Sequence, residues 1–427
     1  MAEKFDSVVV GAGPAGIAAA YTMAKAGLNV LVLEKGEKPG AKNMFGGIIF
    51  RHHTEKLAPE FWKTAPVERH VVEYQYWFLS KDSHLLLSHR NQKFNSHYNA
   101  FTVHRAKFDP WFAKLAEDAG AVIINRTTVD DVLKENGKII GVKTERGDIL
   151  ADVVVAADGV NSMLAKQAGL REELPQDAVV LALKEVIAVP KQKIEERFNL
   201  GPEEGIAALL VGWGPGMHAG FMYTNRDTIS LGIAISLRDL DKSKQRPNVL
   251  FEQFKSHPSI APLIKDGELK EYSAHLIPEG GYDYVANTYT DGMLVVGDAA
   301  MLVNAVNWEG TNLAMTSGII AGETVIEAKK KKNDFSSRTL AKYRERLEES
   351  FVLKDLKKYR GIPKFFSSNP EFFTLYPDTL NELFYMWHVV DDEFKADRIK
   401  RMKATLFKRR SRVSLVRDFY HLWRLFS

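Results

Sequence analysis

The sequence predicts an α/β fold in which a doubly wound, Rossmann-like domain is interrupted by a mainly β domain and followed by a helical C-terminal part. The chain opens with an apolar strand at residues 5–10, a glycine-rich turn and a helical stretch, and a second apolar strand follows at 31–35. That order begins a parallel sheet with crossover helices. Residues 180–237 are mostly β-like, and the pattern from about residue 335 onward is helical.

The remaining elements alternate between these kinds of structure. The pattern predicts strands at 71–80, 121–126, 137–146, 149–159 and 292–298, and helices at 106–120 and from about Gly310. Turns are expected at 360–370 and 375–378. Because the sheet resumes after the β-rich stretch, the nucleotide-binding domain is built from separated pieces. We expect it to comprise 1–75, 100–175 and 270–330, with 76–99 and 176–269 in the β-rich domain, and 331–427 in a helical region with a basic amphipathic tail.

Composition narrows the functional classes. The chain has 427 residues and no cysteine, which excludes disulfides, a thiolate nucleophile, thiolate-bound zinc and an iron–sulfur cluster carried by this chain. No leader peptide or apolar run of about 18 residues is apparent, so we expect a cytoplasmic protein. Residues 401–427 carry a net charge of +7, whereas the whole chain carries +4. Residues 1–400, the body of the protein, therefore carry −3. That distribution argues against a nucleic-acid-binding body.

The first motif with chemical meaning is Gly11-Ala-Gly13-Pro-Ala-Gly16, between the first strand and the first helix. Gly11 permits a tight turn, Gly13 lets the backbone approach a pyrophosphate, and Gly16 lets helix and strand pack closely. The helix N-terminus adds free N–H donors for phosphate groups. A plain glycine turn is the alternative, but strand, helix and a later acid are all in place.

That acid is Glu34, 18 residues after Gly16, at the end of the second strand. An acid there holds a ribose 2′-hydroxyl and favours NAD or FAD over a 2′-phosphorylated nucleotide. A second glycine cluster, Gly212-Trp213-Gly214-Pro215-Gly216, has the wrong spacing and no helix after it. We interpret it as a bend between strands, with a second nucleotide site as the alternative. One dinucleotide is expected.

Two acids follow apolar strands where ligands bind in open α/β sheets: Asp158-Gly159 follows VVVAA, and Gly297-Asp298 follows LVV. With the glycine motif, this arrangement resembles the FAD-binding fold of the glutathione-reductase type, second subgroup. The resemblance implies that Asp298 hydrogen-bonds the ribityl chain of FAD. Helix capping is the alternative role for Asp298.

The same resemblance gives roles to two further segments. The helix that starts near Gly310 would direct backbone N–H groups around Thr311 and Asn312 at the pyrimidine edge of the flavin. In this flavoprotein group an arginine matching Arg105 contacts FAD, and a surface ion pair is the alternative. We expect Asp109 to be an N-cap with Pro110 in the first helical position.

A narrower resemblance covers essentially the whole chain. It rests on KPGAKNMFGG, ALKEVIAVP, IEERFNL, GFMYTNRDTISLGIAI, HLIPEGG and GDAAMLVNAVNWEGTNLAMTSG. These segments resemble the electron-transfer flavoprotein–quinone oxidoreductases, in particular the short bacterial FixC type. The resemblance places the segment from Lys42 to Gly47 along the flavin, where close backbone approach needs glycine. The expected cofactor-binding residues are Gly11, Gly13, Pro14, Ala15, Gly16, Glu34, Lys35, Lys42, Asn43, Gly46, Gly47, Arg105, Asp158, Gly159, Gly297, Asp298, Gly310, Thr311 and Asn312.

Two departures bear on partners and chemistry. Long members of this family carry a four-cysteine iron–sulfur module that this chain lacks, so the resemblance implies a separate ferredoxin-like subunit. Flavin hydroxylases often have a histidine and prolines after the GD motif, whereas this chain has Met301-Leu-Val-Asn304-Ala-Val. That difference weakens a monooxygenase interpretation.

A quinone site needs an apolar cavity with few polar contacts. Trp213, Met217, Phe221, Met222 and Tyr223 are the aromatic and Met-rich candidates, and an ordinary β-domain core is the alternative. No catalytic residue is assigned, because the chemistry belongs to the flavin.

In the tail, Leu415, Phe419, Leu422 and Phe426 recur at helical spacing among basic residues. Such a helix fits a membrane surface, a partner or the protein's own body equally well.

The resemblance implies an FAD enzyme that relays electrons from electron-transfer flavoprotein subunits to a quinone, from a peripheral position on the inner face of the cell membrane. It also raises membership of an electron-bifurcating complex, which the residues themselves do not establish. Alternatives are a geranylgeranyl-reductase-like flavoenzyme acting on isoprenoid lipids, a flavin monooxygenase, and a non-catalytic FAD-containing assembly subunit.

Overall fold

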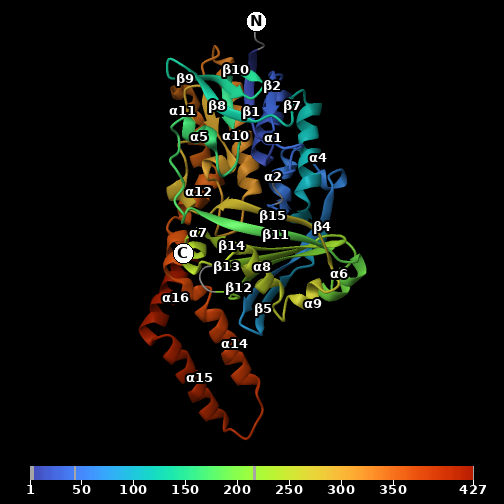
Figure 1. The fold of residues 1–427 in the computed structure, drawn as a ribbon, viewed down its shortest axis with the longest axis vertical. Helices are drawn as coiled ribbons and strands as arrows, with labels where there is room; N and C mark the ends of the chain where they lie inside the picture. Colours follow the sequence, from blue (N-terminus) through green and yellow to red (C-terminus); the bar gives the residue numbers. More distant parts are fainter. Residues whose placement is uncertain (1–3, 43–44, 215–217, 427) are drawn as a thin grey trace.

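The structure is a computed structural model that describes residues 4–42, 45–214 and 218–426. Two sheets lie one beyond the other along the long axis of the molecule, and a helical C-terminal part extends past the second sheet (Figure 1). The predicted fold class is confirmed. Among the described helices, none combines the length and the apolar character that crossing a bilayer requires.

The first sheet has the strand order β16-β17-β10-β1-β2-β7, and its five strands from β17 to β7 are parallel. The antiparallel pair β8 and β9 extends it beside β10. These strands are β1 (Lys4–Val10), β2 (Val30–Leu33), β7 (Val122–Ile124), β8 (Val129–Glu135), β9 (Lys138–Thr144), β10 (Gly147–Ala156), β16 (Tyr289–Thr290) and β17 (Met293–Val295). The order β10-β1-β2 puts the carboxyl ends of three strands at one edge, where ligands bind in such sheets.

Helices α1 (Pro14–Lys25) and α10 (Thr311–Lys330) pack closely against each other beside this sheet, and α4 (Arg105–Asp118) packs against α1. The close approach depends on small residues. A Cβ atom at Gly318 would lie 2.2 Å from the carbonyl oxygen of Ala15, and one at Gly322 would lie 2.8 Å from the Cβ of Thr22. Shorter helices complete this half: α2 (Arg51–Glu55), η1 (Phe61–Lys63), α5 (Met163–Gln167) and η3 (Gly297–Ala300).

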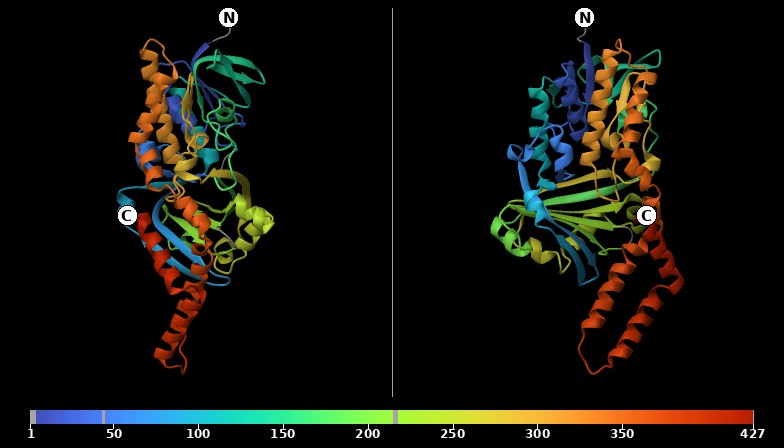
Figure 2. Two further views of the ribbon diagram at one scale, coloured as in Figure 1. Left: turned by 90° about the vertical axis from the view of Figure 1, so that its left-hand side faces the viewer. Right: turned by 180° about the vertical axis from the view of Figure 1, so that it is seen from behind.

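The second sheet has the order β15-β11-β14-β13-β12-β4-β6-β3, with β5 beside β4. Its strands are β3 (Ile48–Phe50), β4 (Val67–Leu79), β5 (His84–Arg90), β6 (Ala100–Val103), β11 (Val179–Ala188), β12 (Glu204–Val211), β13 (His218–Thr224), β14 (Thr228–Ser236) and β15 (Glu268–Pro278). One face packs into an apolar core with α6 (Lys191–Phe198) and α8 (Pro247–Lys255). The other face looks toward the first sheet (Figure 2). Smaller pieces are α3 (Lys93–Ser96), α7 (Leu237–Ser243), α9 (Ala261–Ile264) and η2 (Gly281–Tyr284).

Sheet membership differs from the predicted division of the chain. The structure pairs β3, β6 and most of β15 with the second sheet, although the predicted division assigns these residues to the nucleotide-binding pieces. The division into domains therefore stays a prediction, and the sheets supply a different boundary.

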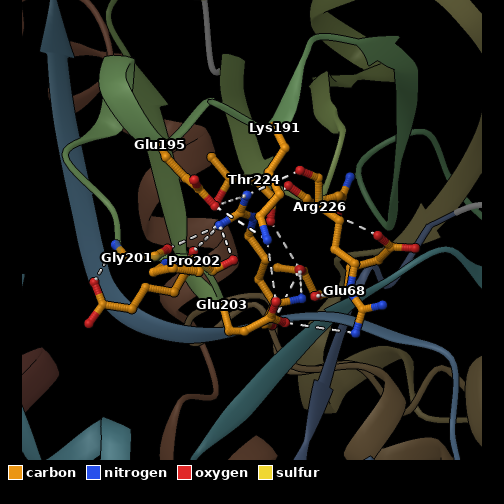
Figure 3. A network of polar contacts seen from close by, with 12 residues as sticks. Glu68, Lys191, Glu195, Gly201, Pro202, Glu203, Thr224 and Arg226 are labelled. Atoms are coloured by element: carbon orange, nitrogen blue, oxygen red, sulfur yellow. Dashed lines mark hydrogen bonds and ion pairs between the residues drawn. The ribbon is translucent and has the colours of Figure 1, made fainter. Parts of the chain in front are cut away.

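A buried arginine ties the loops at one end of the second sheet together. Arg69, on β4, is 1% exposed, and its guanidinium donates to five backbone carbonyl oxygens. The acceptors belong to Gly201, Pro202, Glu204, Asn225 and Arg226, and Glu195 supplies a carboxylate at 3.2 Å. Figure 3 shows Glu195, Gly201 and Pro202 drawn together in this network. The N–H donors of one planar group thus hold together backbone carbonyls on both sides of the sheet end, in the segment leading into β12 and in the loop between β13 and β14.

The C-terminal part begins with α11 (Ser337–Glu349) and α12 (Phe351–Lys358), in contact with α10. It continues through α13 (Ile362–Ser368), η4 (Pro370–Phe372), α14 (Leu375–His388), α15 (Lys395–Arg409) and α16 (Arg412–Phe426). The turn predicted at 360–370 is confirmed only at its start, where Arg360 and Gly361 form a turn. The turn predicted at 375–378 is wrong. Pro363 and Pro377 lie in the first turns of α13 and α14, where a missing N–H costs nothing. The hairpin of α14 and α15 projects away from the sheets (Figure 1).

The residues of the predicted apolar stripe on α16 lie on two different faces of the helix. Leu415 and Leu422 are half-buried, whereas Phe419 is 68% exposed; the side chain of Phe426 lies outside the described residues. Asp418 is buried on the covered face, where it pairs with Arg410 and accepts a hydrogen bond from Tyr376 at 2.6 Å. One side of the tail therefore packs on the protein's own body.

Candidate cofactor-binding site

A cavity of about 720 Å³ lies between the two sheets. Its first half is walled by the glycine turn, the ends of β2 and β10, and the start of α10. Its second half is walled by the segment around Gly46 and by the inward face of the second sheet. The cavity therefore reaches from the carboxyl edge of a parallel sheet to the floor of a second sheet.

The three motif glycines occupy three different environments. Gly11 has φ +104°, and a Cβ there would lie 2.3 Å from the carbonyl oxygen of Ala157. A Cβ at Gly16 would lie 2.0 Å from the carbonyl oxygen of Gly11, so helix and strand pack there without room for a side chain. A Cβ at Gly13 would meet no protein atom within 4 Å, although Gly13 lines the cavity. Space at the N-terminus of α1 agrees with a phosphate approaching the backbone.

Glu34 stands at the end of β2 and lines the cavity. Its carboxylate accepts hydrogen bonds from the backbone N–H of Ala12 at 2.9 Å and of Gly36 at 2.5 Å. Each oxygen keeps lone-pair capacity for one more donor. The glycine turn and Glu34 are thus tied together by the protein's own backbone.

The two acids after strands differ in their partners. Asp158 accepts from the hydroxyl of Ser162 at 2.6 Å and from the N–H of Leu164 at 3.2 Å, and burial raises its pKa. Asp298 lies inside η3, whose N-cap is Val296, so the capping alternative does not apply. It lines the cavity, and burial raises its pKa to about 6 although Arg105 opposes that shift. A carboxylate in this position can accept hydrogen bonds from ligand hydroxyls.

Arg105 is buried and lines the cavity, but its guanidinium is largely engaged by the protein. It donates to both oxygens of Asp109, at 2.6 and 2.7 Å, and to the carbonyl oxygen of Phe45 at 2.6 Å. The predicted N-cap role of Asp109 is wrong. Helix α4 begins at Arg105 with His104 as its N-cap, so Asp109 is one turn inside and Pro110 lies in the helix interior. The surface ion-pair alternative for Arg105 is also wrong, because the pair is buried.

Gly46 has φ +74°, and a Cβ there would lie 2.8 Å from Thr311 and 3.0 Å from Arg105. Thr311 begins α10 and donates its hydroxyl hydrogen to the carbonyl oxygen of Ile48 at 3.2 Å. The glycine segment and the N-terminus of α10 therefore form one corner of the cavity. Helix N–H groups at this corner favour negative charge.

Most predicted cofactor residues line the cavity. They are Gly11, Gly13, Pro14, Ala15, Glu34, Lys35, Lys42, Gly46, Gly47, Arg105, Asp158, Gly159, Asp298, Gly310 and Thr311. Three do not: Gly16 and Gly297 pack against neighbouring backbone or side chains, and Asn312 turns its amide to Glu309. Asn43 lies outside the described residues. Direct contact of these residues with a cofactor stays a prediction.

Strand alternation divides the predicted aromatic cluster. Phe221 and Tyr223 line the cavity, with ring centroids 5.3 Å apart. Met222 lies on the opposite face, in the core beside α8. Trp213 lies in the loop after β12 and packs against Phe254 of that core. Met217 lies outside the described residues. The strands on either side of the predicted bend, β12 and β13, pair antiparallel, and Pro215 and Gly216 of the bend lie outside the described residues.

Three ionisable residues of the cavity were not predicted. Lys184 lies on β11, His275 on β15, and Glu279 just after β15. Burial lowers the pKa of Lys184 to about 8 and raises that of Glu279 to about 7, and it lowers the pKa of His275. For Lys184 the signal was a lysine in the middle of the apolar run VVLALKEVIA. Lysine is rarely buried without a specific reason.

Comparisons with known proteins agree with this geometry. The model of the FAD binding domain matches residues 4–346, and that of the ETF-QO/FixC family C-terminal domain matches residues 362–427. The chain is 46% identical to Protein FixC of Azorhizobium caulinodans, covering 99% of both chains. It is 42% identical to the probable electron transfer flavoprotein-quinone oxidoreductase YdiS of Escherichia coli, covering 90% of this chain and 91% of that one.

Solved structures share the fold. A geranylgeranyl bacteriochlorophyll reductase-like protein from Thermoplasma acidophilum superposes with a TM-score of 0.75 at 23% identity, over 98% of this chain and 99% of that one. The flavin-dependent brominase Bmp2 gives 0.66 at 19% identity, over 87% and 91%. At these identities the likeness concerns the fold alone.

FAD is the cofactor of this chain, and the cavity fits it. The space at Gly13 suits a pyrophosphate, Glu34 is placed for a ribose, and Asp298 faces the cavity at the start of the second half. Gly46 and Gly47 let the backbone pack closely against Thr311, Arg105 and Lys184 at the corner formed with α10, and both line the cavity.

Proposed function

The chain belongs to the ETF-QO/FixC family of FAD-dependent electron-transfer oxidoreductases, and on that premise we propose that it relays electrons from an electron-transfer flavoprotein to a quinone. The observation that carries the proposal is the full-length similarity to FixC proteins and to YdiS, together with a cavity that continues past the FAD-binding edge. The second half of that cavity is apolar apart from a few ionisable groups, as a quinone head group requires.

FAD supplies the redox chemistry when bound. The residues of this chain hold it and set its surroundings. N–H groups at the start of α10 favour negative charge at the adjacent corner, and the Arg105–Asp109 pair keeps the backbone at Phe45 in place. Phe221 and Tyr223 form an aromatic wall of the second half.

Our proposal includes a separate ferredoxin-like subunit, because the chain has no cysteine to bind a cluster of its own. It extends to assembly with electron-transfer flavoprotein subunits, in a complex that could also split electron pairs between two acceptors. Both points rest on the family resemblance.

We place the protein on the cytoplasmic face of the cell membrane, where a lipid-soluble quinone is found. Support comes from large apolar side chains exposed in the C-terminal part. The tip of the α14–α15 hairpin exposes Trp387, Val390 and Phe394, and α16 exposes Phe419 and Trp423. Clustered aromatic residues of this kind suit a lipid interface or a partner protein.

An anaerobic titration of the FAD-loaded chain tests the relay. NADH is added first, then reduced electron-transfer flavoprotein, then a soluble quinone analogue, while flavin absorbance is followed. We expect bleaching only with the flavoprotein and recovery with the quinone. Rapid bleaching by NADH or NADPH alone would contradict the proposal. Turnover of a polyprenyl lipid without the flavoprotein would instead favour the reductase alternative.

A further inference from the structure

Strand β11 places two adjacent charges in the interior of the second sheet. Lys184 is 1% exposed and Glu185 is 5% exposed. Because neighbouring side chains in a strand point to opposite faces, only Lys184 reaches the cavity. Glu185 faces the other way, where Lys255 of α8 lies 3.0 Å from its carboxylate. The buried lysine of the cavity wall is therefore separate from this ion pair.

The surroundings of Lys184 place its ammonium at the FAD corner. A Cβ on Gly47 would lie 3.3 Å from its Nζ atom and 3.4 Å from the ring of Tyr223. The charges of Arg105 of α4 and Glu271 of β15 act in opposite directions on its pKa. His104 also feels the charge of Lys184, and His275 lines the same wall. Burial dominates and lowers the pKa of Lys184 to about 8.

The floor beside Lys184 is apolar. Ala234 of β14 pairs with Ala219 of β13, and both line the cavity together with Phe221 and Tyr223. Lys184 itself pairs with Gly232, where a Cβ would lie 2.2 Å from the ring of Phe221. Glycine at that position lets the Phe221 ring lie against the sheet. The result is an apolar platform with one ammonium group at its margin.

We propose that the quinone head group lies on this platform and that the Lys184 ammonium donates a hydrogen bond to one quinone carbonyl oxygen and a proton to that oxygen on reduction. The inference rests on the proposed function and names the site of its second substrate. The overall change, FADH⁻ + quinone + H⁺ → FAD + quinol, balances with a single added proton. Lys184 supplies that proton, and water restores it to the amine. Lys184 is thus a catalytic residue.

The test isolates the oxidative half of the cycle. FAD-loaded protein is reduced with dithionite, freed of excess reductant, and mixed in a stopped-flow instrument with the soluble quinone 2,3-dimethoxy-5-methyl-1,4-benzoquinone at pH 6.5 to 10. Lys184→Met removes the charge at similar length, and Lys184→Arg keeps the charge at all these pH values. Lys270→Met, an exposed lysine of β15, is the matched control.

We expect the wild-type rate constant to be level below about pH 8 and to fall about tenfold per pH unit above it, since the ammonium form is then lost. Lys184→Arg should show no fall near pH 8. Lys184→Met should be reoxidised about tenfold to hundredfold more slowly than wild type, and its rate constant should show no fall near pH 8. It should also bind the oxidised quinone about tenfold more weakly, because a hydrogen bond from a charged group is lost. FAD content and the Lys270→Met rates should not change.

Two results would overturn the inference and leave the relay standing: reoxidation of Lys184→Met at the wild-type rate and pH profile, or a wild-type profile level through pH 9. If Lys184→Met does not fold, the pH profiles of the reoxidation rate for wild type and Lys184→Arg still test the inference. A different result, wild-type protein that any electron-transfer flavoprotein reduces but no quinone reoxidises, would contradict the proposed function itself.

Discussion

Arg105 and Asp109 face each other across one turn of α4, joined by two hydrogen bonds of 2.6 and 2.7 Å. Both side chains are buried, and the remaining guanidinium nitrogen donates to the backbone of Phe45. The arginine expected to contact the cofactor therefore first organises the protein around it. Its charge still reaches the cavity, where it lowers the pKa of Lys184 and opposes the raised pKa of Asp298.

Asp109→Asn should destabilise the protein strongly. The change leaves the buried Arg105 charge without its counter-charge, which typically costs about 3 to 5 kcal/mol in the free energy of unfolding. Urea unfolding followed by circular dichroism measures it. Asp118→Asn, in the same helix but exposed and paired with Lys114, should change the free energy by about 0.5 kcal/mol or less. Equal effects of the two changes would show that the buried Arg105–Asp109 pair contributes no more to the free energy of unfolding than an exposed ion pair.

Gly13→Ala and Gly16→Ala should separate cofactor binding from folding. A Cβ at Gly13 meets no protein atom within 4 Å, so the cofactor-free variant should unfold at nearly the wild-type urea concentration. It should bind FAD at least about tenfold more weakly, because the methyl group occupies the space of the pyrophosphate. Fluorescence titration of FAD measures this.

Gly16→Ala should have the opposite effect: it should lower the stability of the cofactor-free protein. Its Cβ would lie 2.0 Å from a backbone oxygen, which cannot move without displacing α1 from β1. We expect a loss of about 1 to 3 kcal/mol in stability before any FAD is added. A stable Gly16→Ala protein with weak FAD binding would reverse the assignment of roles.

Asp298 should give the cofactor-free protein a distinct dependence of stability on pH. Burial raises its pKa from 3.8 to about 6 in the folded state, so the folded state binds the proton more tightly than the unfolded state. Its contribution is fully present below pH 3.8 and is lost as the pH rises to about 6. Relative to Asp298→Asn, wild type should lose about 1 to 3 kcal/mol across that window. Parallel stability curves for the two proteins would show that Asp298 titrates normally.

Arg69→Lys should lower the free energy of unfolding, although the substitution keeps the positive charge. One ammonium cannot reach five carbonyl oxygens that a planar guanidinium serves together, so several buried acceptors lose their donor. Each unsatisfied group costs about 1 to 3 kcal/mol. Chemical unfolding measures the difference, with Lys193→Arg as a control, since the side chain of Lys193 is 44% exposed and pairs with Asp266. A loss below about 1 kcal/mol would mean that water replaces the missing donors.

Local patterns predicted the cofactor edge well. The glycine motif, Glu34 and the acid after LVV are each defined by a strand end, and strand ends are visible in sequence. Asp109 was misassigned because an aspartate before a proline is typical of a helix start, and the competing attraction of Arg105 arises only once the helix is formed. Trp213 and Phe221 could not be separated, because Trp213 lies in the loop after β12 and its contact with Phe254 of α8 arises only in the tertiary structure.

Lys184 and Glu185 also bear on how the second sheet finds its correct pairing. A shift of β11 by one residue would turn the carboxylate toward the FAD edge and bury the ammonium against Phe251 and Phe254 on the outer face. Neither charge would then find its present surroundings. Two neighbouring charges on opposite faces thus penalise misaligned sheets during folding, and the same lysine that we assign to the quinone helps to select the one alignment in which the cavity exists.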